Sequence, residues 1–305
     1  MYDIIIIGAG PAGLTAAIYA RRSNKRVLVF EAISYGGQLV NISDIENYPG
    51  YEHINGVDLA TKLYDQAINL GAEILFERVI NIEEFGKVKE VITKDKSYKA
   101  KTVIIATGSE NRKLGLANEN ELIGKGVSYC ATCDGNFHKN KEVAVVGGGK
   151  VALEDALYLS DICKTVYLIH HSDKFSDDDE VMPLLKEKKN IKFIVNSNVT
   201  KLNADNVLQS IEVTGNDGSK QEISVSGIFI AIGRIPENGN FGKLINLNEK
   251  GYVIASDNCH TNVDGIFAAG DNRVKSLRQI VTATNDGAVA AVEAIKYINR
   301  EWRNE

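Results

Sequence analysis

The stretch IIIIGAGPAGLTAAIYARRSNKRVLVFE, residues 4–31, decides the fold. Its four isoleucines form a continuous apolar run, as in a strand that is buried on both faces of a sheet. A glycine-rich turn at residues 8–13, a helix-like segment and a second strand that ends at Glu31 follow in that order. Glycines of this spacing let a pyrophosphate approach a helix N-terminus, and an acid at the strand end can bind a ribose hydroxyl. The stretch therefore predicts a dinucleotide-binding unit.

The same pattern returns in the second half of the chain. It comprises a strand at residues 143–146, a glycine-rich turn at 147–152, a helix start at 153–159 and a strand at 165–169. In this copy His170 stands where the first copy has Glu31. Two such units predict an α/β protein with two Rossmann-like domains.

The rest of the chain is mostly strand-like and closes with a helix. The predicted strands are residues 72–79, 88–93, 102–106, 193–195, 209–214, 223–231 and 266–269, and the helix covers residues 280–299. No long linker or low-complexity segment interrupts this order.

Composition narrows the class of protein. The chain has 305 residues, 44% hydrophobic and 25% charged, which suits two domains with a sizeable core. A net charge of -5 argues against a general nucleic-acid binder. The early apolar run is too short to span a membrane, and no basic region or cleavage site marks a secretory signal. Four cysteines do not make a disulfide framework in a chain this long, so a cytoplasmic location is expected.

A Cys-Ala-Thr-Cys-Asp run precedes the second unit. Cys130 and Cys133 have the spacing of a redox-active pair, in which the pKa of one thiol is lowered. A zinc site would need a second pair of ligands, and Cys163 and Cys259 stand alone in the sequence. These two are more readily interpreted as buried apolar side chains. Asp134 suits an acid that protonates a leaving thiolate, with a solvated turn residue as the alternative.

Seven motifs resemble the thioredoxin reductase family of small flavoprotein disulfide reductases. They are GAGPAG at residues 8–13, GGQL at 36–39, ENYPG at 46–50, ATGS at 106–109, GVSYCATCDG at 126–135, GIFAAGD at 265–271 and RQIVTA at 278–283. The resemblance implies an FAD domain formed by residues 1–114 and 243–305, with an NADPH-type domain inserted at 115–242. It also implies a homodimer, with thioredoxin as the substrate.

The resemblance also implies roles for individual residues. Cys133 would exchange electrons with the flavin, Cys130 would attack the partner disulfide, and Asp134 would supply the proton. The residues implied to contact FAD are Gly8, Gly10, Pro11, Ala12, Gly13, Glu31, Gly37, Gln38, Asn47, Val79, Thr107, Gly108, Asp271, Arg278, Gln279 and Ile280. After the RQIVTA motif, Thr284 and Asn285 replace the family's usual Ala-Gly, which we expect to adjust packing only.

The second unit lacks the determinants of NADPH binding. NADPH-dependent relatives carry an HRRxxFR-like string whose arginines bind the 2′-phosphate, whereas this chain reads HHSDKFS at residues 170–176. Four acids follow at 177–180, and Lys150 and Val151 replace small polar residues in the turn. Each lost charge-assisted hydrogen bond is worth about 1.5–3 kcal/mol. NADH is not favoured either, because it requires an acid where His170 stands.

The same loss is typical of a subgroup, the ferredoxin-dependent flavin thioredoxin reductases, which this sequence resembles most. Reduced ferredoxin is therefore the expected electron donor. Three alternatives stay open: an NADPH-dependent reductase with altered contacts, a diflavin oxidoreductase with a second FAD in the second unit, and a flavin-containing redox sensor.

Positive side chains that could dock an acidic ferredoxin are Arg112, Lys113, Lys139, Lys141, Arg273 and Lys275. Trp302 could cover a flavin face, within the chain or across a dimer interface, or pack on the last helix turn.

Overall fold

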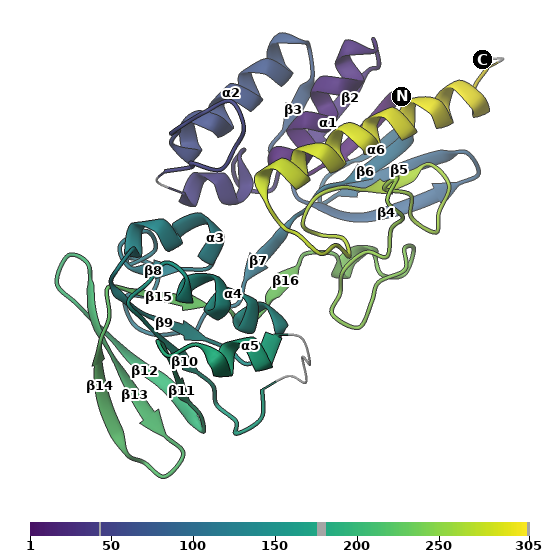
Figure 1. The fold of residues 1–305 in the computed structure, drawn as a ribbon. Coiled ribbons are helices and arrows are strands. Elements are labelled where there is room, and N and C mark those ends of the chain that lie inside the picture. Colours follow the sequence, from purple (N-terminus) through teal and green to yellow (C-terminus); the bar gives the residue numbers. More distant parts are fainter. Residues whose placement is uncertain (43, 176–180, 304–305) are drawn as a thin grey trace. The chain divides into compact units, whose positions relative to one another are not determined.

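The computed structural model describes residues 1–42, 44–175 and 181–303 and forms two compact units (Figure 1). Unit 1 consists of Met1–Glu110 and Ile235–Glu305, and unit 2 is Asn111–Arg234. The breaks expected after residues 114 and 242 fall after residues 110 and 234, because Leu114 packs on a core cluster of unit 2 and Phe241 belongs to one of unit 1. Strands β7 (Ser109–Asn111) and β16 (Arg234–Pro236), which carry the chain between the units, pair with each other.

Unit 1 is built on a seven-stranded sheet in the order β3-β2-β1-β6-β5-β4, with β17 paired to β6. The strands are β1 (Tyr2–Ile7), β2 (Val27–Phe30), β3 (Glu73–Leu75), β4 (Val79–Phe85), β5 (Val88–Thr93), β6 (Ser97–Ile105) and β17 (Ile266–Ala268). Pairs around β1 are parallel, whereas β4, β5 and β6 pair antiparallel. Ile4 and Ile6 of β1 pack in one core cluster and Ile5 and Ile7 in another, so both faces of this strand are buried, as predicted.

The helices of unit 1 are α1 (Pro11–Arg22), α2 (Gly56–Asn69) and α6 (Ile280–Glu301), with short 3-10 helices at Gly37–Asn41 and Gly239–Phe241. Pro11 opens α1 at a position where its missing N–H costs nothing. Helices α1 and α6 pack closely at Gly287, which has no side chain. A Cβ at this position would lie 2.1 Å from the Ala12 carbonyl oxygen. This contact brings the last helix of the chain onto the first.

Unit 2 contains a five-stranded parallel sheet in the order β11-β10-β9-β15-β8 and a three-stranded antiparallel sheet, β12-β13-β14. The strands of the first are β8 (Val127–Ser128), β9 (Glu142–Val146), β10 (Thr165–Ile169), β11 (Ile191–Ile194) and β15 (Gly227–Ile230). Those of the second are β12 (Ser197–Ala204), β13 (Leu208–Gly215) and β14 (Lys220–Ser224). The helices are α3 (Ala131–Asp134), α4 (Lys150–Ser160) and α5 (Val181–Glu187), with a 3-10 helix at Gly135–His138.

Two stretches that were each predicted to form one strand contain parts of two strands. Residues 72–79 divide into β3, a parallel partner of β2, and the start of β4, an antiparallel partner of β5. Residues 223–231 divide into β14 and β15, which belong to different sheets. Neither stretch contains a proline; the first break falls at residues 76–78, which include Glu77 and Arg78, and the second at Val225 and Ser226. A change of strand partner depends on distant segments, so neither break could be read from the local pattern. Among the described helices, none is both long and apolar enough to cross a membrane.

Candidate functional site

The first glycine turn, residues 8–13, connects β1 to α1 and is shaped by its packing. Gly8 has a φ of +109°, and a Cβ on it would lie 2.3 Å from the Ala106 carbonyl oxygen. A Cβ on Gly13 would lie 1.8 Å from the carbonyl oxygen of Gly8. In contrast, a Cβ on Gly10 would meet no described atom within 4 Å. Gly8 and Gly13 are therefore needed for the turn itself, whereas Gly10 leaves room for a ligand at the N-terminus of α1.

Glu31 ends β2 beside this turn. Its Oε2 accepts a hydrogen bond of 2.9 Å from the Ala9 amide, and its Oε1 accepts one of 3.0 Å from the Ile33 amide. The carboxylate is thus fixed next to the turn, where the sequence predicts a ribose contact.

A cavity of about 280 Å³ opens along the same edge of unit 1. Four predicted residues line it: Gly8, Glu31, Val79 and Thr107. The sequence reasoning missed Arg78 and a distant segment that also lines it, which includes Glu237 and Asn240. Arg78 Nη1 lies 3.3 Å from Glu237 Oε2, and Thr107 Oγ1 donates to the neighbouring Asn238 Oδ1 at 3.1 Å. These partners lie more than 100 residues apart in the sequence and share no local motif, so their contacts could not be predicted.

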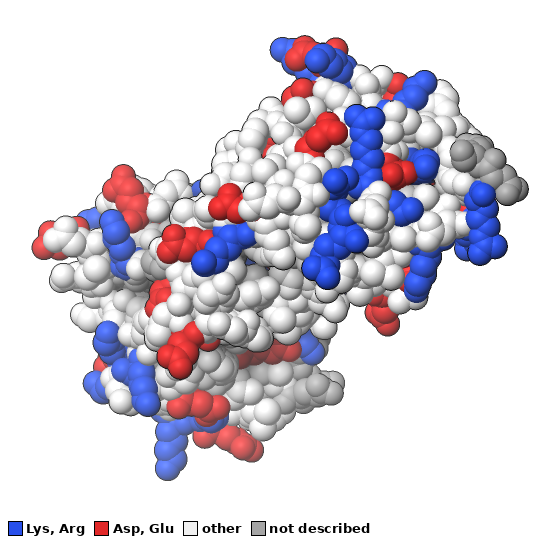
Figure 2. Space-filling view, turned by 90° about the horizontal axis from the view of Figure 1, so that it is seen from above, with Lys and Arg blue, Asp and Glu red and all other residues white. Residues whose placement is uncertain are grey.

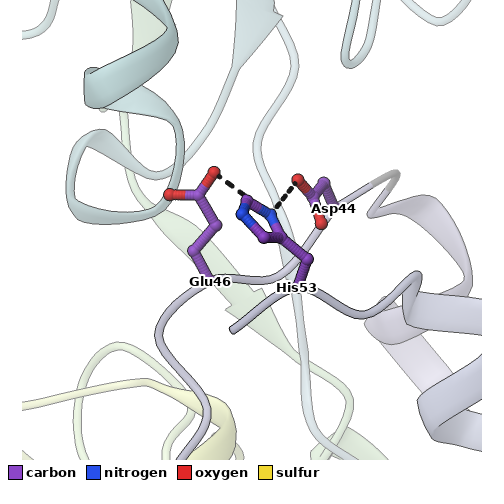
Figure 3. A group of neighbouring side chains, drawn as sticks. All are labelled: Asp44, Glu46 and His53. Atoms are coloured by element: carbon purple, nitrogen blue, oxygen red, sulfur yellow. Dashed lines mark hydrogen bonds and ion pairs between the residues drawn. The ribbon is translucent and has the colours of Figure 1, made fainter. Parts of the chain in front are cut away.

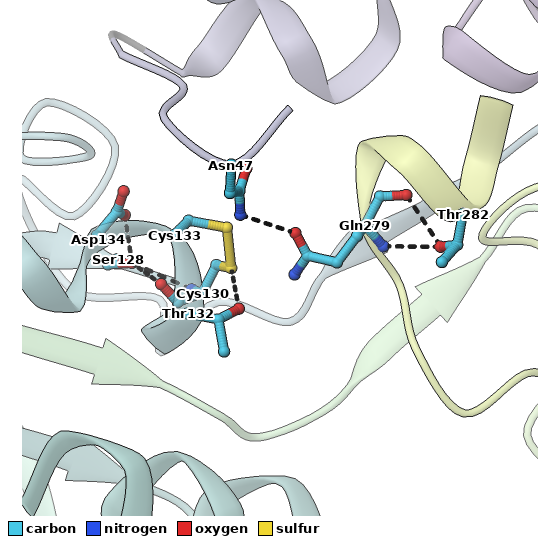
Figure 4. The surroundings of a disulfide bond; sticks show 8 residues. All are labelled: Asn47, Ser128, Cys130, Thr132, Cys133, Asp134, Gln279 and Thr282. Carbon is cyan, nitrogen blue, oxygen red and sulfur yellow. Dashed lines mark hydrogen bonds between the residues drawn. A yellow bond between two sulfur atoms is a disulfide. The ribbon is translucent and has the colours of Figure 1, made fainter. Parts of the chain in front are cut away.

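The N-terminus of α6 gathers another group of predicted residues (Figure 4). Gln279 is the N-cap, and its backbone amide donates to Thr282 Oγ1 at 3.1 Å in a capping box. Asn47 Nδ2 donates to Gln279 Oε1 at 3.2 Å, which ties the loop after the first 3-10 helix to this helix end. The Arg278 guanidinium lies over the Tyr252 ring, 4.4 Å from its centroid, and Ile280 opens the helix.

The remaining predicted contacts occupy turns of unit 1. Gly37 and Gln38 begin the first 3-10 helix, and a Cβ on Gly37 would lie 3.4 Å from Gly10 Cα. Gly108, with a φ of +72°, follows β6, and Asp271 follows β17 directly after Gly270. A helix N-terminus, a fixed carboxylate and a cavity on one sheet edge fit a nucleotide cofactor with a pyrophosphate and a ribose.

The two cysteines of the CxxC motif form a disulfide at the start of α3. The Cα atoms of Cys130 and Cys133 are 5.3 Å apart, and Cys130 is the N-cap of the helix. Figure 4 shows the surrounding polar group, in which Cys130 Sγ lies 3.4 Å from Thr132 Oγ1. A closed pair argues against the zinc alternative and for thiol–disulfide chemistry.

Asp134 lies one residue after the pair, with its carboxylate turned toward β8. Its Oδ2 accepts a 2.5 Å hydrogen bond from Ser128 Oγ, and the same hydroxyl accepts one of 3.1 Å from the Cys130 amide. Burial raises the pKa of the Asp134 carboxyl, and the Ser128 hydrogen bond only partly opposes it. A carboxyl that holds its proton more readily is suited to protonate a thiolate.

The other two cysteines differ from this pair. Both Cys163 and Cys259 are free and buried. Burial raises the pKa of the Cys163 thiol to about 11 and that of Cys259 to about 12. Neither thiol is therefore activated as a nucleophile, and both act as apolar side chains, as predicted.

The second glycine turn, residues 147–152, repeats the backbone of the first. Gly147 has a φ of +145°, and a Cβ on it would lie 2.4 Å from the Ala231 carbonyl oxygen, whereas Gly149 has no described atom within 4 Å of such a Cβ. Lys150 opens α4, with its Nζ 3.8 Å from Glu154 Oε1, and Val151 is 60% exposed. The turn has the shape of a phosphate site but presents a lysine and a branched apolar residue.

The strand end beside the second turn carries aromatic rings instead of an acid. The His170 ring covers Gly148, since a Cβ there would lie 2.3 Å from His170 Nε2. Phe175 packs on this ring with centroids 5.2 Å apart, and the His171 ring meets it edge-on with centroids 4.3 Å apart. Burial lowers the pKa of His170, so its neutral form is favoured. Ser176 and the acids at 177–180 lie outside the described residues.

Two of the proposed docking residues are wrong. The side chains of Arg273 and Lys275 are only 7% and 9% exposed, because both pair with the buried carboxylate of Asp286. The other four, Arg112, Lys113, Lys139 and Lys141, are exposed. On the face seen in Figure 2, basic and acidic side chains are interspersed.

Trp302 follows α6 and packs on the core cluster that contains α1 and α6, with Lys101 Nζ 5.4 Å from the centre of its ring. Helix α6 has 22 residues, which at about 1.5 Å per residue places Trp302 about 30 Å from Gln279. Within the chain, Trp302 therefore packs at the far end of α6 from Gln279, the residue predicted to lie near the flavin.

One cluster of acidic and imidazole groups lies near Asn47 (Figure 3). His53 Nδ1 lies 3.0 Å from Asp44 Oδ2 and 3.6 Å from Glu46 Oε1. The hydrogen bond that the His53 imidazole donates to the Asp44 carboxylate raises the pKa of His53. Because buried Ile45 and Ile54 form a bridge, the three polar side chains meet on the outer side of the loop. Ion pairing accounts for this arrangement.

Comparisons with known proteins extend over nearly the whole chain. The family described as "Pyridine nucleotide-disulphide oxidoreductase" matches residues 2–287. A thioredoxin reductase of Listeria monocytogenes is 44% identical over 300 residues, which cover 98% of this chain and 94% of the relative. The crystal structure of a thioredoxin reductase from Streptococcus pyogenes is similar with a TM-score of 0.94 at 41% identity, covering 98% and 99% of the two chains. A ferredoxin-flavin thioredoxin reductase from Clostridium acetobutylicum matches with a TM-score of 0.56 at 31% identity, over 99% of both chains.

Proposed function

Since the chain belongs to the pyridine nucleotide-disulphide oxidoreductase family, among relatives that are thioredoxin reductases, we propose that it reduces thioredoxin through FAD and the Cys130–Cys133 pair, with reduced ferredoxin as the electron donor. The observation that carries the proposal is a contrast within the chain. Unit 1 has an open glycine turn with a fixed carboxylate beside it, and unit 2 has a disulfide, but the second glycine turn is not followed by the arginines expected of a 2′-phosphate site.

FAD would lie along the edge of unit 1. Its pyrophosphate would bind at residues 8–13 and the N-terminus of α1, and Glu31 would bind the adenosine ribose. Asp271 would hold the middle of the cofactor, and the start of α6 at Gln279 would lie near its flavin end. When bound, FAD supplies the means of passing electrons from a one-electron donor to a two-electron acceptor.

The dithiol then carries out the exchange with thioredoxin. In the reduced pair, the Cys130 thiolate attacks the substrate disulfide, which forms a mixed disulfide and releases one substrate thiolate. Cys133 attacks Cys130 Sγ, which restores the Cys130–Cys133 disulfide and releases the second thiolate. Two electrons and two protons leave the enzyme in each cycle, and Asp134 is placed to deliver a proton.

The energetics are compatible with ferredoxin as the source. Thioredoxin has a reduction potential of about -270 mV and plant-type ferredoxins of about -400 mV. The transfer of two electrons from ferredoxin to thioredoxin is therefore favourable by about 6 kcal/mol. The exposed cations Arg112, Lys113, Lys139 and Lys141 are the docking candidates. A homodimer and a cytoplasmic location complete the proposal.

The strongest competing function is that of an NADPH-dependent thioredoxin reductase. The backbone of the second glycine turn is intact and open at Gly149, and the similar protein of Listeria monocytogenes is named simply a thioredoxin reductase. The same open turn would also accept a second FAD, as in a diflavin oxidoreductase. A redox sensor would keep the disulfide without steady turnover.

Anaerobic mixing of the purified protein with NADPH, NADH and reduced ferredoxin separates these functions. We expect the flavin absorbance to bleach within seconds with ferredoxin and to persist at micromolar nucleotide. Fast bleaching by NADPH would instead establish the competing reductase. A flavin-to-chain ratio near two would identify the diflavin enzyme. Steady thioredoxin reduction that Cys133→Ser abolishes would exclude the sensor.

A further inference from the structure

Three charged side chains meet in the interior of unit 1. The side chains of Arg273, Lys275 and Asp286 are 7%, 9% and 6% exposed. A single oxygen, Asp286 Oδ2, lies 3.2 Å from Arg273 Nη1 and 2.8 Å from Lys275 Nζ. We call these residues the Asp286 cluster. None of the cofactor contacts or dithiol steps described above uses it.

The cluster holds more positive than negative charge. Two cations face one carboxylate, which leaves one net positive charge in the cluster. The surrounding segment does not remove it, because residues 270–287 contain three cations, Arg273, Lys275 and Arg278, and two carboxylates, Asp271 and Asp286. A buried charge without full compensation is costly to a fold. An anion close to this part of unit 1 would offset the excess of the cluster.

The cluster lies directly behind the first glycine turn. Asp286 Oδ2 also accepts a 3.0 Å hydrogen bond from the Gly270 amide. A Cβ on Gly270 would lie 2.9 Å from Ala12 Cβ, and one on Gly287 would lie 2.1 Å from the Ala12 carbonyl oxygen. Ala12 belongs to the first turn of α1, where the free amides of a helix N-terminus attract an anion.

Further hydrogen bonds fix both cations in place. Arg273 Nη2 donates to the Ser256 carbonyl oxygen at 2.7 Å, and Lys275 Nζ donates to that of Thr282 at 3.3 Å. The two cations therefore hold their positions without a ligand, as a preorganised electrostatic site requires.

We propose that the excess positive charge of the Asp286 cluster attracts the FAD pyrophosphate through the first turn of α1, and that Asp286 limits the size of this charge and holds the Gly270 turn. This inference rests on the FAD site of the proposed function. Low exposure makes the effect long-ranged, because buried charges are screened less by salt than surface charges. The affinity for FAD, and not only the stability of the fold, should then decrease when the net positive charge of the cluster decreases.

A series of charge variants tests this. Lys275→Gln reduces the cluster charge by one, and we expect the apoprotein to bind FAD about tenfold more weakly. The double variant Lys275→Gln/Asp286→Asn restores the native net charge, and the asparagine oxygen can still accept the Gly270 hydrogen bond. Its FAD dissociation constant should lie within about threefold of the native value. FAD titration into apoprotein measures both constants without reference to turnover.

The matched control is Lys94→Gln, which makes the same charge change at an exposed residue of the β5–β6 turn and should leave FAD affinity within about twofold. Native-like affinity in Lys275→Gln, or equal losses in the single and double variants, would overturn the inference. Where Lys275→Gln does not fold, as judged by circular dichroism, Arg273→Gln removes the same charge and carries the same expectation. A native protein that binds no FAD would refute the proposed function instead, since the charge series compares only FAD-binding proteins.

Discussion

The two glycine turns have nearly the same backbone but different surroundings. Gly8 and Gly147 both have positive φ values and pack against the carbonyl of the residue just after a strand, and Gly10 and Gly149 both leave open space. The difference begins at the end of the following strand, where Glu31 presents a carboxylate held by two amides and His170 lays its ring on Gly148. The two turns thus share a backbone geometry, whereas the strand ends beside them present different side chains to any ligand in the turn.

The largest expected effect comes from blocking each turn in its own unit. Gly13→Ala places a Cβ 1.8 Å from the Gly8 carbonyl oxygen and should destabilise unit 1 by about 3 kcal/mol, with loss of bound flavin. Gly147→Ala makes a similar collision in unit 2 and should lower stability while the flavin stays bound. Thermal unfolding and flavin content distinguish the two. Equal flavin loss in both variants would show that the turns do not act separately.

A second prediction gives unit 2 the side chains that it lacks. The double substitution His171→Arg/Ser172→Arg adds two cations where a 2′-phosphate would bind. It should tighten NADPH binding by at least about 10- to 100-fold, which is what one of the two added charge-assisted hydrogen bonds supplies at about 1.5–3 kcal/mol. Isothermal titration with NADPH and NADH measures the change, which should be confined to NADPH. An unchanged affinity would mean that features other than the missing arginines close the site.

The open glycines provide a more sensitive comparison. Gly10→Ala and Gly149→Ala each add a methyl group into space free of described atoms, so both variants should fold normally. Gly10→Ala should weaken FAD binding about tenfold, because the methyl group occupies space that the cofactor would fill. This corresponds to about 1.4 kcal/mol of binding free energy, a typical effect of one substitution. Gly149→Ala should change neither flavin content nor thioredoxin turnover with ferredoxin. A loss of turnover in Gly149→Ala would indicate that unit 2 does bind a nucleotide.

The smallest effect concerns two histidines whose pKa values shift in opposite directions. The pKa of His53 is raised, so its ion pairs stabilise the fold below the unfolded value, and this is lost as the pH rises through the folded pKa. The pKa of His170 is lowered, so the fold loses stability as the pH falls below the unfolded value. His53→Gln should therefore reduce the stability of the fold more at pH 5.5 than at pH 8. His170→Gln should reduce the loss of stability that the native protein shows between pH 8 and pH 5.5. Melting temperatures across this range measure the signs, and two slopes of the same sign would contradict the assignment.

Much of this architecture could be predicted because it depends on local pattern. The apolar run at Ile4–Ile7, the glycine spacing and the Cys130–Cys133 spacing each specify a local geometry, and the structure contains all three. Contacts between distant segments could not be predicted. Arg78 meets Glu237, and Lys275 is buried by Asp286, although a lysine and an arginine in an isolated turn suggest an exposed surface. Burial is a property of the packed fold, which a single stretch of sequence does not contain.

The paired strands β7 and β16 make unit 2 a removable module. The chain leaves unit 1 after Glu110 and returns at Ile235, and just inside unit 2 the Arg112 amide donates to the Gly233 carbonyl oxygen at 3.0 Å. Two chain ends held this close can be joined by a short turn. Protein engineers could thus delete the insertion to leave a minimal flavin carrier, or graft a different redox module between the same two strands.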